Sequence, residues 1–171
     1  MKSRPHLNIT YISERLKKAL CDISQYKVTT VTAPMGYGKT TAVSSFLKEA
    51  EAEGALVRRQ SIYGNNVSLF WKSFCRLFFG MEIFEELSEL PFPADENSRS
   101  FFLELVNESL TEDRPFYCFL DDLHLLSDPA VFELLFSLAL HAPSCLHLIL
   151  VSRNPVFSPG EKLLLGQRVL E

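Results

Sequence analysis

The residues with the clearest chemical potential form one glycine-containing run. It matches the spacing G-x-x-x-x-G-K-[ST] of a phosphate-binding loop, with Ala33 in place of the first glycine. Gly36 and Gly38 permit backbone conformations in which successive N–H groups point inward, toward an anion. Lys39 supplies a positive charge for the β- and γ-phosphates of a nucleoside triphosphate, and the Thr40 hydroxyl can ligate Mg²⁺. The predicted nucleotide-binding residues of this run are Ala33, Pro34, Met35, Gly36, Tyr37, Gly38, Lys39, Thr40 and Thr41.

Two aspartates follow an apolar run, at the point where a strand is expected to end. Residues 116–120 (FYCFL) have the composition of a buried parallel strand, and Asp121 and Asp122 come directly after them. We predict that Asp121 holds Mg²⁺ through water and that Asp122 polarises the attacking water. Taken alone, such a pair is more often a helix cap or a loop charge, but the phosphate-binding run upstream favours the magnesium hypothesis.

A third polar group follows another apolar run. Residues 146–151 (LHLILV) lead directly into Ser152, Arg153 and Asn154. Ligands of open parallel sheets lie beyond the carboxyl ends of the strands. We therefore predict that Arg153 contacts the γ-phosphate, whereas the alternative is a surface arginine paired with an acid.

The elements that must position these residues alternate along the chain. Apolar and β-branched runs predict strands at 27–33, 55–62, 116–120 and 146–151, with a further strand beginning at the chain end. Helical spacing predicts helices at 8–21, 40–53, 67–79, 97–110 and 129–141. We expect loops at 82–99 and around Pro155, Pro159 and Gly160.

This alternation predicts the fold class. Strands that alternate with helices form a parallel sheet covered on both faces. The expected fold is therefore an α/β, three-layer sandwich of the P-loop NTPase type, with a mostly parallel sheet of about five strands. The charged pair Arg58 and Arg59 predicts that the second strand lies at an edge of this sheet.

Composition excludes several classes of protein. Of 171 residues, 17 are Lys or Arg and 21 are Asp or Glu, and the resulting charge of −4 argues against nucleic-acid binding. No run approaches the roughly 18 apolar residues of a membrane span, so we expect no membrane partner. The four cysteines are too far apart in the sequence for a zinc site or a disulfide framework. We therefore expect reduced, structural cysteines and a cytoplasmic location. The cysteines are Cys21, Cys75, Cys118 and Cys145.

The motifs together resemble a known family. The runs APMGYGKTTAV, VSLFWKSF, FLDDLHLL and LILVSRN are similar to the nucleotide-binding domain of LuxR-type, maltose-activator-like transcriptional regulators, which belong to the STAND class of signalling ATPases. The resemblance implies binding of ATP and ADP with Mg²⁺, slow hydrolysis that acts as a switch, and self-association in the ATP state of the full-length protein. It also implies that the acidic strand and the Arg153 strand lie beside the strand of the phosphate loop.

The resemblance sets further expectations for the ends of the chain. Residues 1–171 would form a single P-loop NTPase domain at the amino terminus of a longer regulator. The sensor and helix-turn-helix regions would follow it, so we expect no nucleic acid bound by this fragment. An amino-terminal arginine approaches the nucleotide in relatives. Arg15 and Arg4 both partly match this arginine.

Two other functions remain open from the residues alone. A small-molecule or nucleoside kinase would share the phosphate loop, but it usually carries several lid arginines, and residues 155–171 contain only Arg168. A nucleotide-gated interaction module would bind nucleotide without useful hydrolysis. The sequence has no Asn-Lys-x-Asp box for reading guanine, which favours adenine.

Overall fold

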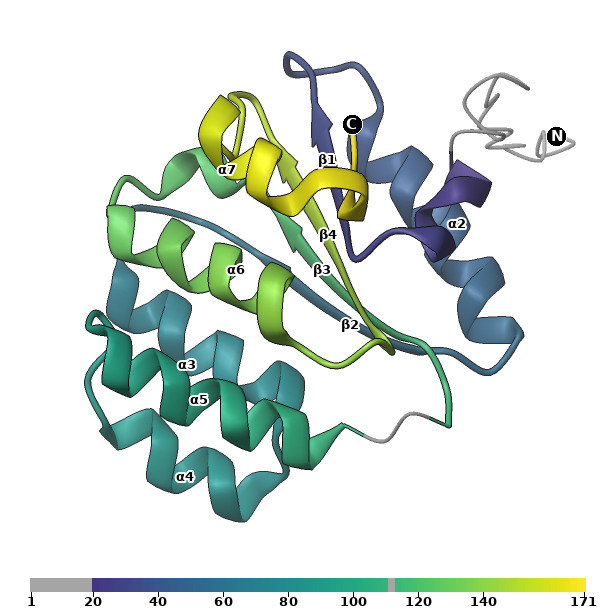
Figure 1. Cartoon of the computed structure of the whole chain (residues 1–171). Coiled ribbons are helices and arrows are strands. Elements are labelled where there is room, and N and C mark those ends of the chain that lie inside the picture. The colour runs from purple at the N-terminus through teal and green to yellow at the C-terminus, as the bar shows by residue number, and fades with distance from the viewer. Residues whose placement is uncertain (1–19, 111–112) are drawn as a thin grey trace, which may run out of the picture.

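The computed structural model describes residues 20–110 and 113–171. Arg4, Arg15 and nearly all of the helix expected at 8–21 lie outside these ranges. In the described ranges, successive strands are separated by one or more α-helices, as expected (Figure 1). In chain order they are β1 (Val28–Thr32), α2 (Lys39–Ala52), β2 (Leu56–Ser61), α3 (Val67–Phe78), α4 (Met81–Glu89), α5 (Glu96–Ser109), β3 (Phe116–Asp121), α6 (Pro129–His141), β4 (Leu146–Ser152), α7 (Pro159–Leu165) and β5 (Val169–Leu170), with short 3-10 turns η1 (Asp22–Gln25), η2 (Leu123–Leu125) and η3 (Gly166–Arg168).

The five strands form one parallel sheet in the order β2-β3-β4-β1-β5. The expected parallel α/β sheet is therefore confirmed, and β2, with its two arginines, lies at the edge as predicted. One expectation about the order is wrong. Of the two strands expected beside β1, only β4, which leads to Arg153, pairs with it. The acidic strand β3 lies one position farther out, because β4 is inserted between β1 and β3.

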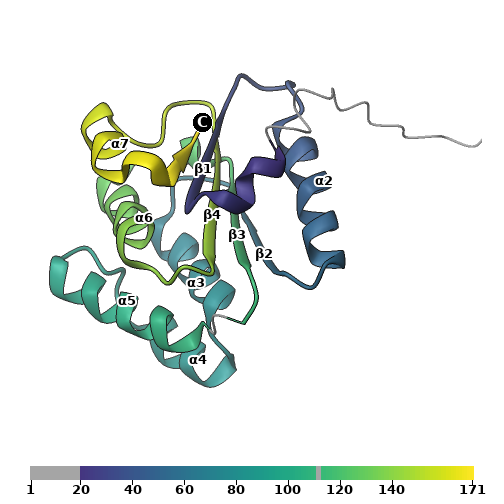
Figure 2. The same cartoon turned by 45° about the vertical axis from the view of Figure 1, so that its right-hand side comes forward.

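Helices cover both faces of the sheet. Alternate residues of β3 point to opposite sides: Cys118 and Leu120 enter the core beneath α3 and α6, whereas Phe119 packs with α2. In Figure 2 the sheet lies between α2 on one side and α5, α6 and α7 on the other. Strands β3 and β4 are buried almost completely, which explains their continuous apolar sequence.

An aromatic cluster fixes the helices that lie away from the phosphate loop. The ring centroids of Trp71 and Phe102 are 5.0 Å apart, and those of Phe74 and Phe102 are 6.1 Å apart. The Trp71 indole also donates a hydrogen bond to the Leu87 carbonyl at the end of α4. Residues 81–89 were expected to belong mostly to a loop, which is wrong. They form a helix because Phe84 and Leu87, three residues apart, both reach the core.

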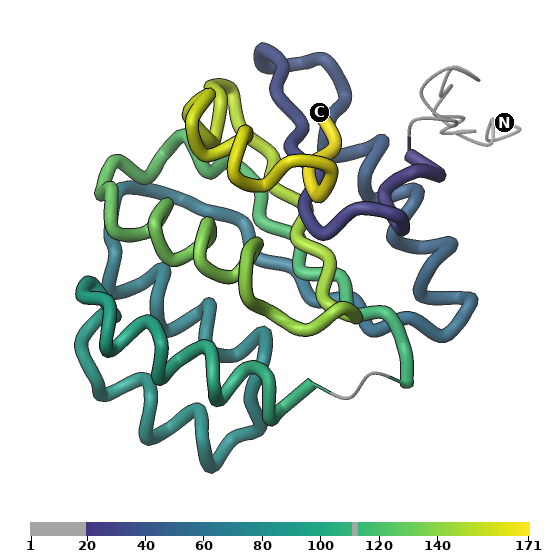
Figure 3. The backbone as a smooth tube through the Cα atoms, in the orientation of Figure 1, coloured from purple at the N-terminus to yellow at the C-terminus, as the bar shows by residue number. Residues whose placement is uncertain are grey.

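The carboxyl-terminal segment also differs from expectation. Pro159 and Gly160 begin α7 rather than a loop, because Ser158 and Glu161 form a reciprocal capping box and proline suits the first helical position. The segment then returns to the sheet as β5, which pairs with β1. The backbone trace of Figure 3 shows this segment next to the beginning of the described chain.

Within residues 20–110 and 113–171, no helix is both long and apolar enough to cross a membrane. Burial raises the pKa of the Cys75 thiol to about 12 and also raises that of Cys118. Both thiols therefore stay protonated and act as packing groups, as expected for structural cysteines.

Leu148 provides a test of this core. Its side chain is 1% exposed in β4, so we expect Leu148→Ala to lower the free energy of unfolding by about 2–5 kcal/mol. Leu163 on α7 is 82% exposed, and Leu163→Ala should change stability by less than about 0.5 kcal/mol. Urea denaturation followed by circular dichroism measures both. Equal effects of the two substitutions would contradict the described packing.

Candidate functional site

The phosphate-binding run forms the turn between β1 and α2. Gly36 has a φ of +85° and Gly38 a φ of +72°, values that a residue with a Cβ rarely adopts. Helix α2 begins directly after Gly38, whose carbonyl accepts a hydrogen bond from the Ala42 N–H at 2.9 Å. Because Gly38 is the N-cap and has no side chain, no capping group satisfies the first N–H donors of α2. These donors and the positive end of the helix can receive an anion.

Lys39 lies inside this turn. Its Nζ donates to the carbonyl oxygens of Ala33 at 2.5 Å and Pro34 at 2.9 Å. These contacts hold the ammonium against the loop that should bind the phosphates. The carbonyls are neutral acceptors, so a charged phosphate oxygen at the same place would attract the ammonium more strongly.

The Thr40 hydroxyl connects the phosphate loop to the acidic strand. It donates a hydrogen bond of 2.7 Å to Oδ2 of Asp121, and Asp121 is only 6% exposed. The second carboxylate oxygen, Oδ1, accepts from the Asp122 N–H at 2.9 Å. Although β4 separates β3 from β1, the first turn of α2 reaches across to Asp121. The predicted magnesium residues Thr40 and Asp121 are thus in direct contact.

Asp122 stands just beyond the strand end in an unusual conformation. Its φ of +59° and ψ of +35° make it the one left-handed residue other than glycine in the described ranges. This conformation costs an L-amino acid about 1–2 kcal/mol and turns the chain sharply into η2. The side chain is half exposed, and Oδ1 lies 3.8 Å from Nδ1 of His124, whose side chain is 9% exposed. The turn directs Asp122 toward the phosphate loop.

Arg153 approaches the same loop from β4. Its guanidinium Nη2 lies 3.2 Å from the sulfur of Met35. A cavity of about 250 Å³ lies beside this contact, walled by the turn, the start of α2, Asp122 and Arg153. The structure therefore brings most of the predicted site residues together; those lining this cavity are Met35, Gly36, Gly38, Lys39, Thr40, Thr41, Asp122 and Arg153.

A second cavity, of about 280 Å³, adjoins the first and shares Gly38 and Lys39 with it. Ala33 and Tyr37, two of the predicted binding residues, line this second cavity instead. Its walls are largely apolar and include residues that the sequence reasoning missed: Leu20, Ile23, Ala42, Val43 and Leu170. The only signal for them in the sequence was their apolar character on either side of the loop.

The Thr40 hydroxyl of the first cavity and the buried carboxylate that it contacts suit a magnesium ion. Mg²⁺ keeps several waters and usually takes one or two protein oxygens together with substrate phosphates. The hydroxyl of Thr40 and the carboxylate of Asp121 are two such oxygens, already 2.7 Å apart. Among residues 20–110 and 113–171, no group of three or more His, Cys, Asp or Glu side chains could hold a metal by itself. The donor set therefore fits magnesium bound with a phosphate.

Comparison with sequences of known proteins identifies transcriptional regulators. The chain is 29% identical over 157 residues to the HTH-type transcriptional regulator MalT of Cronobacter sakazakii and 26% identical over 170 residues to that of Klebsiella pneumoniae. Each match includes 89% of this chain but only 17% of the relative, so the chain spans less than a fifth of these proteins. The similarity to maltose-activator-like regulators expected from the motifs is confirmed.

Solved structures of other proteins share this fold. Cdc6p from Pyrobaculum aerophilum superimposes with a TM-score of 0.57 at 22% identity, over 98% of this chain and 47% of that one. A chain of the Drosophila ORC bound to AT-rich DNA and Cdc6 gives a TM-score of 0.58 at 13% identity, over 90% of this chain and 50% of that one. These likenesses confirm the P-loop NTPase fold.

A family model provides the assignment that covers most of the chain. The model of the AAA ATPase domain matches residues 12–151, from before β1 to β4. The matched range contains the phosphate loop and the aspartate pair. The protein therefore belongs to the AAA ATPase domain family.

Proposed function

We propose that this domain binds ATP and ADP with Mg²⁺ and hydrolyses ATP slowly, so that the bound nucleotide sets its conformational state. The observation that carries the proposal is the hydrogen bond of 2.7 Å between Thr40 and Asp121, beside a glycine-rich anion site. A phosphate loop by itself binds many anions. A hydroxyl and a carboxylate fixed together beside it match the protein oxygens that Mg²⁺ takes in nucleotide sites.

Each residue around the cavity has a role that follows from its position. The N–H groups of the turn and of the first turn of α2 bind the phosphates, and Lys39 turns from the Ala33 and Pro34 carbonyls toward the terminal oxygens. Mg²⁺ supplies charge neutralisation on the β- and γ-phosphate oxygens when bound. Thr40 and Asp121 orient the metal, and Arg153 binds the outer face of the γ-phosphate.

Asp122 provides the step that distinguishes hydrolysis from binding. Its carboxylate lines the cavity together with Arg153, so it can accept a hydrogen bond from a water next to the terminal phosphate. The carboxylate thereby aligns the water and accepts its proton as the water attacks. The sharp left-handed turn at Asp122 holds the carboxylate in this position.

The adjoining apolar cavity provides a place for the base. It begins at Gly38 and Lys39, where the phosphate cavity ends, so a nucleotide can extend from one cavity to the other. Apolar walls such as Ile23 and Leu170 suit a flat purine ring. We infer that adenine occupies it, with Tyr37 near the rim.

The sequence relatives suggest the setting of this switch. They are HTH-type transcriptional regulators, and this chain matches 17% of their length. We propose that the domain acts in the cytoplasm as the nucleotide switch of a LuxR-type regulator of the STAND class, with ATP favouring self-association. DNA binding would belong to other regions, since this chain carries a net charge of −4.

Lys39→Ala tests nucleotide binding. Loss of the ammonium removes the strongest side-chain charge facing the phosphates, so we expect the ATP dissociation constant to rise at least about tenfold. Lys48→Ala, an exposed lysine of the same helix, should leave it unchanged. Isothermal titration calorimetry measures both. Unchanged ATP affinity in the Lys39 variant would show that the site is assigned wrongly.

Thr40→Val tests the magnesium site. Valine keeps the shape of threonine but removes the hydroxyl that contacts Asp121, so the Mg²⁺ concentration for half-maximal hydrolysis should rise about tenfold. Thr40→Ser retains the hydroxyl and should stay close to wild type. A magnesium titration of phosphate release separates them. Equal magnesium dependence in all three proteins would contradict the role of Thr40.

Asp122→Asn separates binding from turnover. Asparagine tolerates the left-handed conformation but accepts a proton poorly, so ATP affinity should persist while hydrolysis falls about a hundredfold. Asp128→Asn, which preserves the N-cap of α6, is the matched control. Product chromatography after single-turnover incubation measures the rate. An unaltered rate in the Asp122 variant removes this carboxylate from the mechanism.

A further inference from the structure

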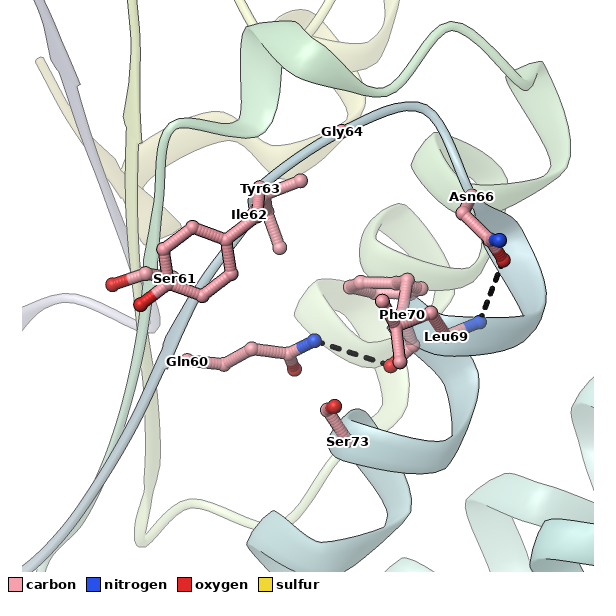
Figure 4. Close-up of a pocket in the computed structure, with 9 residues that line it drawn as sticks. All are labelled: Gln60, Ser61, Ile62, Tyr63, Gly64, Asn66, Leu69, Phe70 and Ser73. Carbon is pink, nitrogen blue, oxygen red and sulfur yellow. Dashed lines mark hydrogen bonds between the residues drawn. The ribbon is translucent and has the colours of Figure 1, made fainter.

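A third cavity lies apart from the nucleotide site, at the carboxyl end of the edge strand β2. It measures about 360 Å³ and lies between the end of β2, the following loop and the first turns of α3 (Figure 4). This volume falls within the range of small-molecule pockets. None of its lining residues belongs to the phosphate loop, to the aspartate pair or to the Arg153 segment.

The cavity has an apolar wall with one conspicuous polar group. Ile62 and Phe70 are buried, 5% and 3% exposed, and they form the apolar part. The amide of Gln60 donates from Nε2 to the Phe70 carbonyl at 3.1 Å. A carbonyl can only accept, so this bond fixes which end of the amide is nitrogen.

The other end of the Gln60 amide is left without a partner. Gln60 is 8% exposed, and its Oε1 has no hydrogen-bond donor within the described part of the chain. Figure 4 shows the amide and the Ser73 hydroxyl beside the same gap between β2 and α3. A buried acceptor without a donor is costly, and a ligand that brings an N–H or O–H group into this gap would remove the cost.

The mouth of the cavity presents apolar groups to solvent. Tyr63 is 89% exposed and Leu69 is 60% exposed, and both line it. The backbone of Leu69 is anchored, because its N–H donates at 2.9 Å to Oδ1 of Asn66, the N-cap of α3. Apolar surface at the rim and an unpaired acceptor at the wall together suit a small molecule with an apolar body and one donor.

The loop beside this cavity is bonded directly to the acidic segment. The Ile62 N–H donates at 3.0 Å to the carbonyl of Asp121. The Asn65 amide donates to the Ser127 hydroxyl at 2.7 Å and accepts from the Ser127 N–H at 3.1 Å. Residues 62–65 are therefore bonded to the chain on both sides of Asp122. The loop is thus in direct contact with the segment that carries the aspartates.

We propose that this cavity is an effector site for a small, mainly apolar molecule that carries one N–H or O–H donor, which pairs with Oε1 of Gln60. Its occupancy changes the affinity for magnesium nucleotide through the Ile62 and Asn65 contacts. This coupling rests on the proposed nucleotide function, whereas the binding of the small molecule does not.

Indole and benzofuran test the binding. They have nearly the same shape, but only indole carries an N–H donor, so indole should bind the whole 171-residue chain about tenfold more tightly without nucleotide. Gln60→Met replaces the amide with an apolar chain of similar length, and the two probes should then bind equally. Calorimetry measures these affinities. If neither probe binds, or if both bind equally to wild type, the proposed site is wrong.

Filling the cavity locates the bound probe and tests the coupling. Ser73→Leu should abolish indole binding, whereas Ser68→Leu, an exposed serine of the same helix, should not. Saturating indole should change the dissociation constant of Mg·ATP about fivefold in wild type and not at all in the Ser73 variant. If indole binds without altering ATP affinity, the coupling is refuted. If ATP itself does not bind, the proposed nucleotide function fails, while the indole result still decides the site.

Discussion

The hydrogen bond between Thr40 and Asp121 joins two segments that the sheet holds apart. Thr40 belongs to the helix that follows β1, Asp121 ends β3, and β4 lies between these strands. The contact can form only if the first turn of α2 lies over the carboxyl end of β4. The strand order, the register of β3 with β4 and the start of α2 at Lys39 are all needed for that geometry. A change in any of them separates the hydroxyl from the carboxylate.

The same geometry explains how charge is distributed at the site. Cationic and donor groups come from the phosphate loop and from Arg153, whereas the two carboxylates come from β3 and the turn after it. Asp121 is buried and bonded by Thr40 and by the Asp122 N–H, so its position is fixed. Asp122 remains half exposed beside the cavity. Asp121 is thus suited to binding an ion and Asp122 to contacting water, although the two are neighbours in sequence.

The sequence predicted which residues gather at the candidate site better than it predicted the strand order. Local signals identified the phosphate loop, because glycine, lysine and threonine act there through the backbone next to them. The same holds for the edge position of β2, whose arginines indicate exposure. The place of β3 could not be predicted from local patterns, because strand order is decided by packing between distant segments. The resemblance to relatives placed β3 beside β1, and the structure inserts β4 between them.

Helices α4 and α7 were not predicted from the sequence, for a different reason. Proline and glycine led to a loop around Pro159, although the capping residues Ser158 and Glu161 were visible in the sequence. Helix α4 is short and strongly acidic. Its two core residues can be recognised as buried only once the positions of Trp71 and α3 are known. The apolar cavity beside the phosphate loop could not be predicted from the sequence for the same reason. Its walls come from η1, β1, α2 and β5, and only the fold brings these together.

The strand order also determines which surfaces can influence the site. Strand β3 lies between β4 and the edge strand β2. The backbone carbonyl of Asp121 therefore accepts a hydrogen bond from the Ile62 N–H on the β2 side, while its carboxylate accepts one from Thr40 of α2. Asp121 is therefore one hydrogen bond away from the loop after β2 and one hydrogen bond away from helix α2. If β3 were at the edge, its outer face would meet solvent, and the loop after β2 would have no contact with the aspartates. The proposed coupling between the two regions therefore requires no long pathway through the core, since the loop after β2 contacts the backbone of Asp121 directly.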